Sequence, residues 1–268
     1  MQKTASLNEL IAIALVFLFS QEAHAYSRII TLAPVISEWT AEILGPESSK
    51  TKIVGVSEYS NYPLQLKSIQ TIGAYPKLNI EKIASFKPDL VLASSEYNRP
   101  EQLEQLKRLK INLQVLPKEN FFEMTKWIRA LASILQSPEA GESLALEWEK
   151  KIESLRKHHS VKKKTLFLEI QHEPLVTIGG ASFLNDAFSV VGFQNVFEPL
   201  AEGYPKVSKE SVLKEKPQAI FILDLTGNPA DFEAAKKDWE RYGFHPKLIS
   251  GDDFARCSFL LLKGLEQL

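Results

Sequence analysis

Cysteine is almost absent from this 268-residue chain, since Cys257 is the only one. No internal disulfide bond can therefore form, and a lone cysteine is most often a small buried apolar residue. Histidine is also scarce: four of the five lie beyond residue 25, and apart from the adjacent His158-His159 they are widely spaced along the chain. A bare metal ion needs several such ligands close together, so we predict no metal site.

Catalytic motifs are missing as well. His172-Glu173 lacks the second histidine that a zinc-binding helix carries four residues after the first. Gly179-Gly180-Ala181-Ser182-Phe183 does not match the nucleophile elbow of hydrolases, and no glycine pattern for phosphate occurs. We therefore predict no catalytic residue, no cofactor and no enzymatic activity. Two alternatives stay open: an enzyme that acts near His172, and an interaction protein without a small ligand.

Neither sign of charge prevails, because 32 Lys and Arg residues stand against 33 Asp and Glu residues. A nucleic-acid-binding protein needs a basic surface, so we expect no nucleic acid partner. Long apolar runs are also lacking: residues 10–19 form an apolar stretch that is shorter than the ~20 residues of a membrane span.

That short run belongs to a pattern typical of a secretory signal peptide in residues 1–25. Lys3 gives a weakly positive start, and Ala23-His24-Ala25 has the small residues of a cleavage site. We predict that residues 26–268 are exported to the periplasm as a monomer. An uncleaved membrane anchor is the alternative.

The chain contains an internal repeat. Residues 79–92 (NIEKIASFKPDLVL) return 129 positions later as residues 208–221 (SKESVLKEKPQAIF). Each copy has a helix-capping residue, a glutamate two positions on, an amphipathic turn, Lys-Pro and an apolar strand. The repeat predicts two similar α/β lobes, and two facing lobes enclose a cleft in which a small ligand can bind.

The alternation of strand and helix patterns divides the chain further. Residues 26–120 and 161–268 alternate, which favours a mostly parallel sheet in each lobe. Residues 121–160 show helical spacing throughout, and Ser137-Pro138-Glu139 has the features of a helix start. We therefore predict an α/β fold: two lobes with mostly parallel sheets, joined by one long backbone helix. Within the lobes we expect a helix over 37–44, ended by Gly45-Pro46, and a strand over 175–178.

Tyrosines gather in the predicted loops. A tyrosine offers broad apolar contact at low entropic cost and a hydroxyl group for a wet rim. Together they favour a large, flat, partly apolar ligand, although each alone could merely hold its own loop in place. These loop tyrosines are Tyr59, Tyr62, Tyr75, Tyr97 and Tyr204.

Several of these segments resemble the helical-backbone periplasmic binding proteins, which deliver cobalamin, ferric siderophores or haem to ABC importers. The resemblance covers essentially all of residues 26–268 and is strongest toward the cobalamin-binding members. It implies two lobes bridged by a rigid helix, with little closure on binding. The segments that carry it are residues 28–34 (RIITLAP), 53–63 (IVGVSEYSNYP), 72–75 (IGAY), 79–81 (NIE), 87–91 (KPDLV) and 216–220 (KPQAI).

The resemblance also implies roles for particular residues. Glu81 and Glu210 match two glutamates that dock onto arginines of the permease, although a carboxylate in the first helical turn is also favoured by the helix dipole alone. The positions that would line the ligand cleft are Pro34, Tyr59, Tyr75, Leu175, Tyr204, Phe254 and Arg256.

The chain departs from the family pattern at several positions in or near the predicted ligand cleft. Three large aromatics are replaced by the smaller Tyr75, Leu175 and Tyr204, and Ser258-Phe259-Leu260 lacks an arginine that the family carries. An anionic siderophore calls for a cluster of basic residues, and this cleft offers Arg256 and Arg99. The expected ligand is therefore cobalamin, and a ferric siderophore or haem is the alternative.

Overall fold

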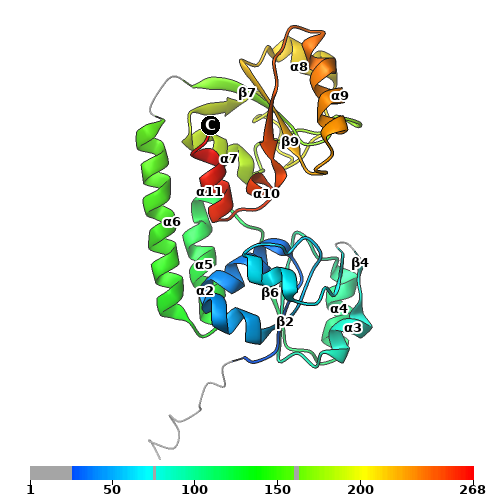
Figure 1. The fold of residues 1–268 in the computed structure, drawn as a ribbon, viewed down its shortest axis with the longest axis vertical. Helices are drawn as coiled ribbons and strands as arrows, with labels where there is room; N and C mark the ends of the chain where they lie inside the picture. The colour runs from blue at the N-terminus through cyan, green and yellow to red at the C-terminus, as the bar shows by residue number, and fades with distance from the viewer. Residues whose placement is uncertain (1–25, 75–76, 160–162) are drawn as a thin grey trace, which may run out of the picture.

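The computed structural model describes residues 26–74, 77–159 and 163–268, so the predicted signal peptide lies outside the described residues. Two α/β lobes lie one above the other, and a long helix runs along one side of both (Figure 1). Both sheets consist of parallel strands, which confirms the predicted fold class. In the part of the chain that is described, no helix is both long and apolar enough to cross a membrane.

The two lobes share one topology. The N-terminal sheet has the order β2-β1-β5-β6 and the C-terminal sheet the order β10-β9-β7-β8. Numbered within its own lobe, and with the C-terminal sheet read from its β8 edge, each sheet runs second, first, third, fourth. This agrees with the two similar lobes that the sequence repeat predicts. The strands are β1 (Ile29–Thr31), β2 (Ile53–Val56), β5 (Leu90–Ser94) and β6 (Leu113–Leu116), then β7 (Lys164–Glu169), β8 (Phe193–Asn195), β9 (Ala219–Asp224) and β10 (Lys247–Ser250).

Helices cover the sheets and connect the lobes. In the N-terminal lobe a short antiparallel pair, β3 (Gly73–Ala74) and β4 (Lys77–Leu78), lies beside the main sheet. The helices of this lobe are α2 (Pro34–Lys52), the 3-10 turn η1 (Leu64–Ser68), α3 (Ile80–Ser85) and α4 (Pro100–Arg108). The connecting helices are η2 (Phe121–Glu123), α5 (Met124–Ile134) and α6 (Pro138–His158). The C-terminal lobe has α7 (Phe183–Val190), α8 (Lys209–Glu215), α9 (Pro229–Glu240), α10 (Gly251–Phe254) and α11 (Phe259–Leu265).

The long helix α6 is the predicted backbone helix. Its 21 residues span about 31 Å at 1.5 Å per residue. It begins at Pro138 with Glu139 in its first turn, which suits the positive end of the helix. It packs closely on α5, because a Cβ atom at Gly141 would lie 2.2 Å from the Cβ atom of Ala132.

An aromatic cluster joins the lobes to this helix. Trp39 of α2 lies 5.8 Å from Trp148 of α6 and 5.0 Å from Phe259 of α11, measured between ring centroids. Phe121 lies 5.5 Å from Trp148. The apolar core that contains these rings continues from the N-terminal sheet through α5 and α6 into the C-terminal lobe. The relative placement of the lobes is therefore fixed by a shared core.

Two local predictions differ from the structure. Residues 175–178 are not a strand: Val176 makes isolated bridges to Gln171 and Lys206. The strand β8 was not predicted: it has three residues and little apolar content, and it pairs with β7 alone. The predicted break after residue 44 is present, since Gly45 has φ 75° and ψ 168° inside the segment that α2 spans.

Candidate ligand-binding site

The loops that follow the parallel strands bring the two lobes together. In open α/β sheets, ligands bind outside the carboxyl ends of the strands. A cavity of about 670 Å³ lies there, between the loop after β2 and the loops after β9 and β10. Its wall includes Tyr59 and Asn61 from the N-terminal lobe and Asp224, Asp252 and Arg256 from the C-terminal lobe.

Tyr59 is the most exposed tyrosine of this region. Its side chain is 74% accessible, and its backbone has φ 67°, a left-handed conformation that is uncommon outside glycine. The loop is held by backbone bonds at both sides: Glu58 N donates to Gly73 O at 3.0 Å, and Ser60 N donates to Ser57 O at 3.3 Å. The ring is therefore free to meet a ligand, and its position is set by the backbone.

Buried hydroxyl groups support the same loop from below. The Oγ atom of Ser60 lies 2.9 Å from Ser37 Oγ and 3.1 Å from Ser57 Oγ. Ser37 Oγ in turn lies 2.6 Å from Thr31 Oγ1. This chain of hydroxyls ties the Tyr59 loop to β1 and to the first turn of α2.

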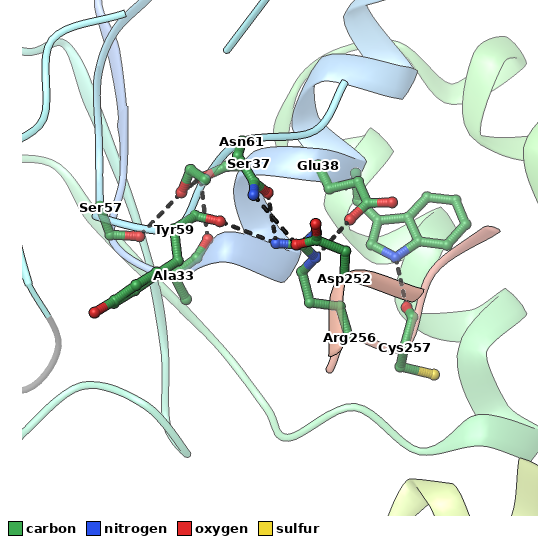
Figure 2. A network of polar contacts seen from close by, with 11 residues as sticks. Ala33, Ser37, Glu38, Ser57, Tyr59, Asn61, Asp252, Arg256 and Cys257 are labelled. Carbon is green, nitrogen blue, oxygen red and sulfur yellow. Dashed lines mark hydrogen bonds and ion pairs between the residues drawn. The ribbon is translucent and has the colours of Figure 1, made fainter. Parts of the chain in front are cut away.

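Arg256 reaches from the C-terminal lobe into this loop (Figure 2). Its Nη1 atom donates to Tyr59 O at 2.9 Å and to Asn61 Oδ1 at 3.1 Å. Its Nε atom lies 3.1 Å from Glu38 Oε2. Burial raises the pKa of Glu38 to about 7, against the opposing effects of the Ser258 hydroxyl and Arg256. Arg256 itself is 7% exposed, so its charge is largely enclosed.

A second contact between the lobes lies around Tyr204. Its side chain is 44% exposed, in the loop that also contains Gly203. A Cβ atom at Gly203 would lie 3.6 Å from Lys118 Nζ of the opposite lobe, and Lys118 pairs with Glu96 at 3.3 Å. Burial raises the pKa of the neighbouring Glu119 to about 7, although a hydrogen bond with Tyr97 favours its charged form.

The other residues that were predicted to line the ligand cleft differ in how far they are buried. Pro34 is half-buried at the start of α2. Leu175 and Phe254 are core residues instead of cleft residues: Leu175 is 7% exposed in the C-terminal core, and Phe254 is 2% exposed and stacks on Phe188. Tyr75 lies outside the described residues.

Glu81 and Glu210 occupy equivalent places in the two lobes. Each is exposed in the first turn of its helix, α3 or α8. The capping residues of the repeat also behave alike: Asn79 Oδ1 accepts from Lys82 N at 2.8 Å, and Ser208 Oγ accepts from Ser211 N at 3.2 Å. Figure 1 shows both helices in the outer part of their lobes, away from α6.

A larger cavity, of about 740 Å³, lies within the C-terminal lobe beside α9. Several of its charged groups are paired with one another. His172 Nδ1 lies 3.0 Å from Glu169 Oε1, and Lys209 Nζ lies 2.5 Å from Asp238 Oδ2. Trp239 Nε1 donates to the second oxygen of Glu169. Because this larger cavity is built by one lobe alone, the cavity between the lobes is the better candidate for the ligand site.

Sequence reasoning missed Glu38, Asn61 and Glu119. Glu38 and Glu119 lie in segments without a motif, and Asn61 lies in the 53–63 segment without a role of its own there. Only the fold brings the three to the lobe boundary. Among the described residues, no group of three or more His, Cys, Asp or Glu side chains is placed to hold a metal ion.

The arrangement of two lobes, one backbone helix and a cavity between strand ends defines a solute-binding protein. The model of the periplasmic binding protein family matches residues 29–239, and the chain belongs to this family. The vitamin B12-binding protein of Vibrio vulnificus (strain YJ016) is 30% identical over 223 residues, covering 83% of this chain and 78% of that protein. A vitamin B12-binding protein of Vibrio cholerae serotype O1 (strain M66-2) is 32% identical over 198 residues, covering 74% and 70% of the two chains.

Solved structures agree on the fold. The periplasmic vitamin B12 binding protein BtuF of Vibrio cholerae superposes with a TM-score of 0.73 at 28% identity, over 91% of this chain and 95% of that chain. The periplasmic haem-binding protein BhuT, in complex with two haems, superposes with a TM-score of 0.75 at 18% identity, over 90% and 96%. At that identity the second likeness shows the fold alone.

Proposed function

We propose that this protein captures a corrinoid of the vitamin B12 class between its lobes and delivers it to the permease of an ABC importer in the inner membrane. The observation that carries the proposal is the cavity between the lobes, with the exposed ring of Tyr59 at its wall. The vitamin B12-binding proteins that resemble the chain over most of its length support the same ligand class. The protein acts as a periplasmic monomer without catalysis.

The electrostatics of the cavity favour a ligand without strong negative charge. Its wall carries the carboxyl groups of Asp224 and Asp252, and the guanidinium of Arg256 is engaged by Glu38. The carboxylates of haem and the oxygens of a ferric catecholate would meet like charge there. The corrin ring carries neutral amides at its edge, which can donate to carboxylates and accept from hydroxyls. We therefore place the corrinoid ahead of haem and siderophores.

Within this function, Tyr59 and Tyr204 would contact the ligand from opposite lobes, with Pro34 beneath it and Tyr75 as a further wall residue. Glu81 and Glu210 would dock onto basic groups of the permease, one on each lobe. Their exposure at equivalent places supports this role, since a charge-assisted pair with arginine needs a free carboxylate.

Calorimetric titration with cyanocobalamin, haemin and a ferric catecholate tests the ligand. We expect saturable binding of one cyanocobalamin and a rise in melting temperature, because a ligand at 100 times its Kd stabilises the folded state by about 2.7 kcal/mol. Absence of heat and of thermal stabilisation with cyanocobalamin would overturn the proposal. Tight binding of haemin or the catecholate alone would assign the protein to that ligand instead.

A further inference from the structure

We propose that Arg256 is a positioning residue, which serves the ligand by holding the Tyr59 loop and not by contacting the ligand. This inference deepens the proposed function and depends on it for the identity of the ligand. The family resemblance implies an arginine that lines the cleft at this position. Here that arginine would hold the Tyr59 loop instead.

The contacts of Arg256 cross the boundary between the lobes. The residue lies between α10 and α11 of the C-terminal lobe, whereas its partners Glu38, Tyr59 and Asn61 belong to the N-terminal lobe. The next residue continues the link, because Cys257 O accepts from Trp39 Nε1 at 2.9 Å. This short segment is therefore bound to the opposite lobe through consecutive residues.

The same segment holds Asn61 in place. Asn61 Oδ1 accepts from Arg256, and Asn61 Nδ2 donates to Asp252 Oδ1 at 3.3 Å. Figure 2 shows Tyr59, Asn61, Asp252 and Arg256 gathered in one polar network. The loop is thus fixed on both sides of Ser60 by groups from the C-terminal lobe.

Tyr59 depends on such support. Its ring is 74% exposed, so packing does little to orient it, and its backbone occupies the left-handed region. A strained backbone of this kind persists where surrounding contacts hold it. The bond from Arg256 Nη1 to Tyr59 O acts directly on the strained residue. Removing the guanidinium should free the loop and scatter the positions of the ring.

The guanidinium is poorly placed for direct contact with a ligand. Although Arg256 lines the cavity, its Nε and Nη2 atoms are enclosed from solvent. Its Nη1 atom is occupied by Tyr59 and Asn61. To reach a ligand, the group would have to leave the buried carboxyl of Glu38, and breaking a buried pair is strongly unfavourable.

A double-mutant cycle separates positioning from contact. We would measure the Kd of cyanocobalamin for the natural protein, Arg256→Gln, Tyr59→Ala and the double variant. If Arg256 acts through Tyr59, Arg256→Gln should weaken binding about tenfold in the natural background and less than about twofold when Tyr59 is already alanine. An equal loss in both backgrounds would overturn the inference, because it would show that the arginine acts on the ligand independently of Tyr59.

Two further variants sharpen this test. Arg256→Lys keeps the charge but loses the fork that reaches Glu38 and Tyr59 together, so it should bind as weakly as Arg256→Gln. Natural affinity in Arg256→Lys would show that charge alone suffices and would contradict positioning. Arg108→Gln, at an exposed arginine of α4, is the matched control and should leave the Kd unchanged.

Amide hydrogen exchange tests the same inference without ligand. Residues 57–63 should exchange at least tenfold faster in Arg256→Gln than in the natural protein, while β1 and β5 keep their protection. Unchanged exchange in the loop would overturn the inference even if cyanocobalamin binds as proposed. If the ligand proves to be a different one, faster exchange still supports the positioning role. Asn61→Ala offers a milder variant, with the same direction of change, should Arg256→Gln fail to fold.

Discussion

Glu38 and Glu119 are carboxyl groups enclosed at the boundary between the lobes. Burial raises the pKa of each to about 7, from 4.5 in the unfolded chain. Around Glu38, Arg256 and the Ser258 hydroxyl favour the charged form, and Glu42 disfavours it. Around Glu119, Tyr97 and Lys118 favour the charged form and Glu96 disfavours it. The desolvation of both groups outweighs these neighbours.

The raised pKa values predict how stability depends on pH. The folded state binds the protons of these two carboxyl groups more tightly than the unfolded chain does. Protonation therefore stabilises the folded state, fully below pH 4.5, and this stabilisation is lost as the pH rises through about 7. Each group contributes up to about 3 kcal/mol, at 1.36 kcal/mol per pKa unit. Urea unfolding between pH 5 and 8 should show the free energy of unfolding falling over this range.

A neutral replacement supplies the control for this prediction. Glu119→Gln should weaken the pH dependence and leave the part due to Glu38, because glutamine fills the same space and does not titrate. Glu149→Gln, at an exposed glutamate of α6, should leave the curve unchanged. A free energy of unfolding that rises from pH 5 to 8 in the natural protein would contradict the assignment.

At the residue scale, the sequence identified part of the candidate site. Tyr59 and Arg256 come together at the lobe boundary as neighbours, but through the carbonyl of Tyr59, which no pattern of side chains could reveal. Phe254 was expected to line the cleft and instead stacks on Phe188. The sequence does not distinguish an aromatic side chain that points into a cleft from one that points into the core beside it. Glu38 carries no motif, and its partner lies 218 positions away along the chain.

The elements were more predictable than the site. The repeat predicted α3 and α8, and the side chains of Asn79 and Ser208 cap those helices as expected. Pro138 and Glu139 marked the start of α6 for similar local reasons. Local sequence patterns did not predict strands that depend on pairing with a neighbouring strand. The strand β8 has three residues and forms because β7 lies beside it.

The packing of α5 on α6 depends on one glycine. At Gly141 an added Cβ atom would lie 2.2 Å from Ala132, whose backbone cannot move without shifting α5. We expect Gly141→Val to reduce stability by about 1–3 kcal/mol through overpacking. Urea unfolding measures the effect.

Ser143 provides the comparison on the same helix. It is exposed two residues further along α6, so Ser143→Val should change stability by less than about 0.5 kcal/mol. Equal stability of the Gly141→Val variant and the natural protein would show that the two helices are not packed as closely as described.

At the scale of the whole molecule, the lobes share one core. The rings of Trp39, Trp148 and Phe259 come from the N-terminal lobe, from α6 and from the C-terminal lobe. Closing the lobes like a hinge would separate these rings and expose apolar surface to water. We therefore expect the cavity to keep a nearly constant width.

This architecture predicts that ligand binding changes the overall shape little. Small-angle scattering with and without saturating cyanocobalamin should give radii of gyration within about 1 Å of each other. Binding confirmed by calorimetry on the same sample excludes an unoccupied site as the reason for no change. A decrease of several ångströms would mean that the shared core yields and that the lobes close on the ligand.

Charge reversal of the two exposed glutamates tests the proposed docking of the whole molecule onto a permease. Glu81 and Glu210 lie on different lobes that α6 and the shared core hold at a fixed separation, so both can engage a partner at once. Charge reversal of both, Glu81→Arg and Glu210→Arg, should abolish cobalamin uptake in cells and leave the Kd of the purified protein unchanged. Either single reversal should give a smaller loss, because two linked contacts strengthen each other.

The matched control reverses Glu101 of α4 and Glu215 of α8, which are exposed but lie outside the repeated position. If uptake survives the first pair of reversals, or falls equally with the control pair, then Glu81 and Glu210 serve the helix dipole of α3 and α8 and not the docking of the protein.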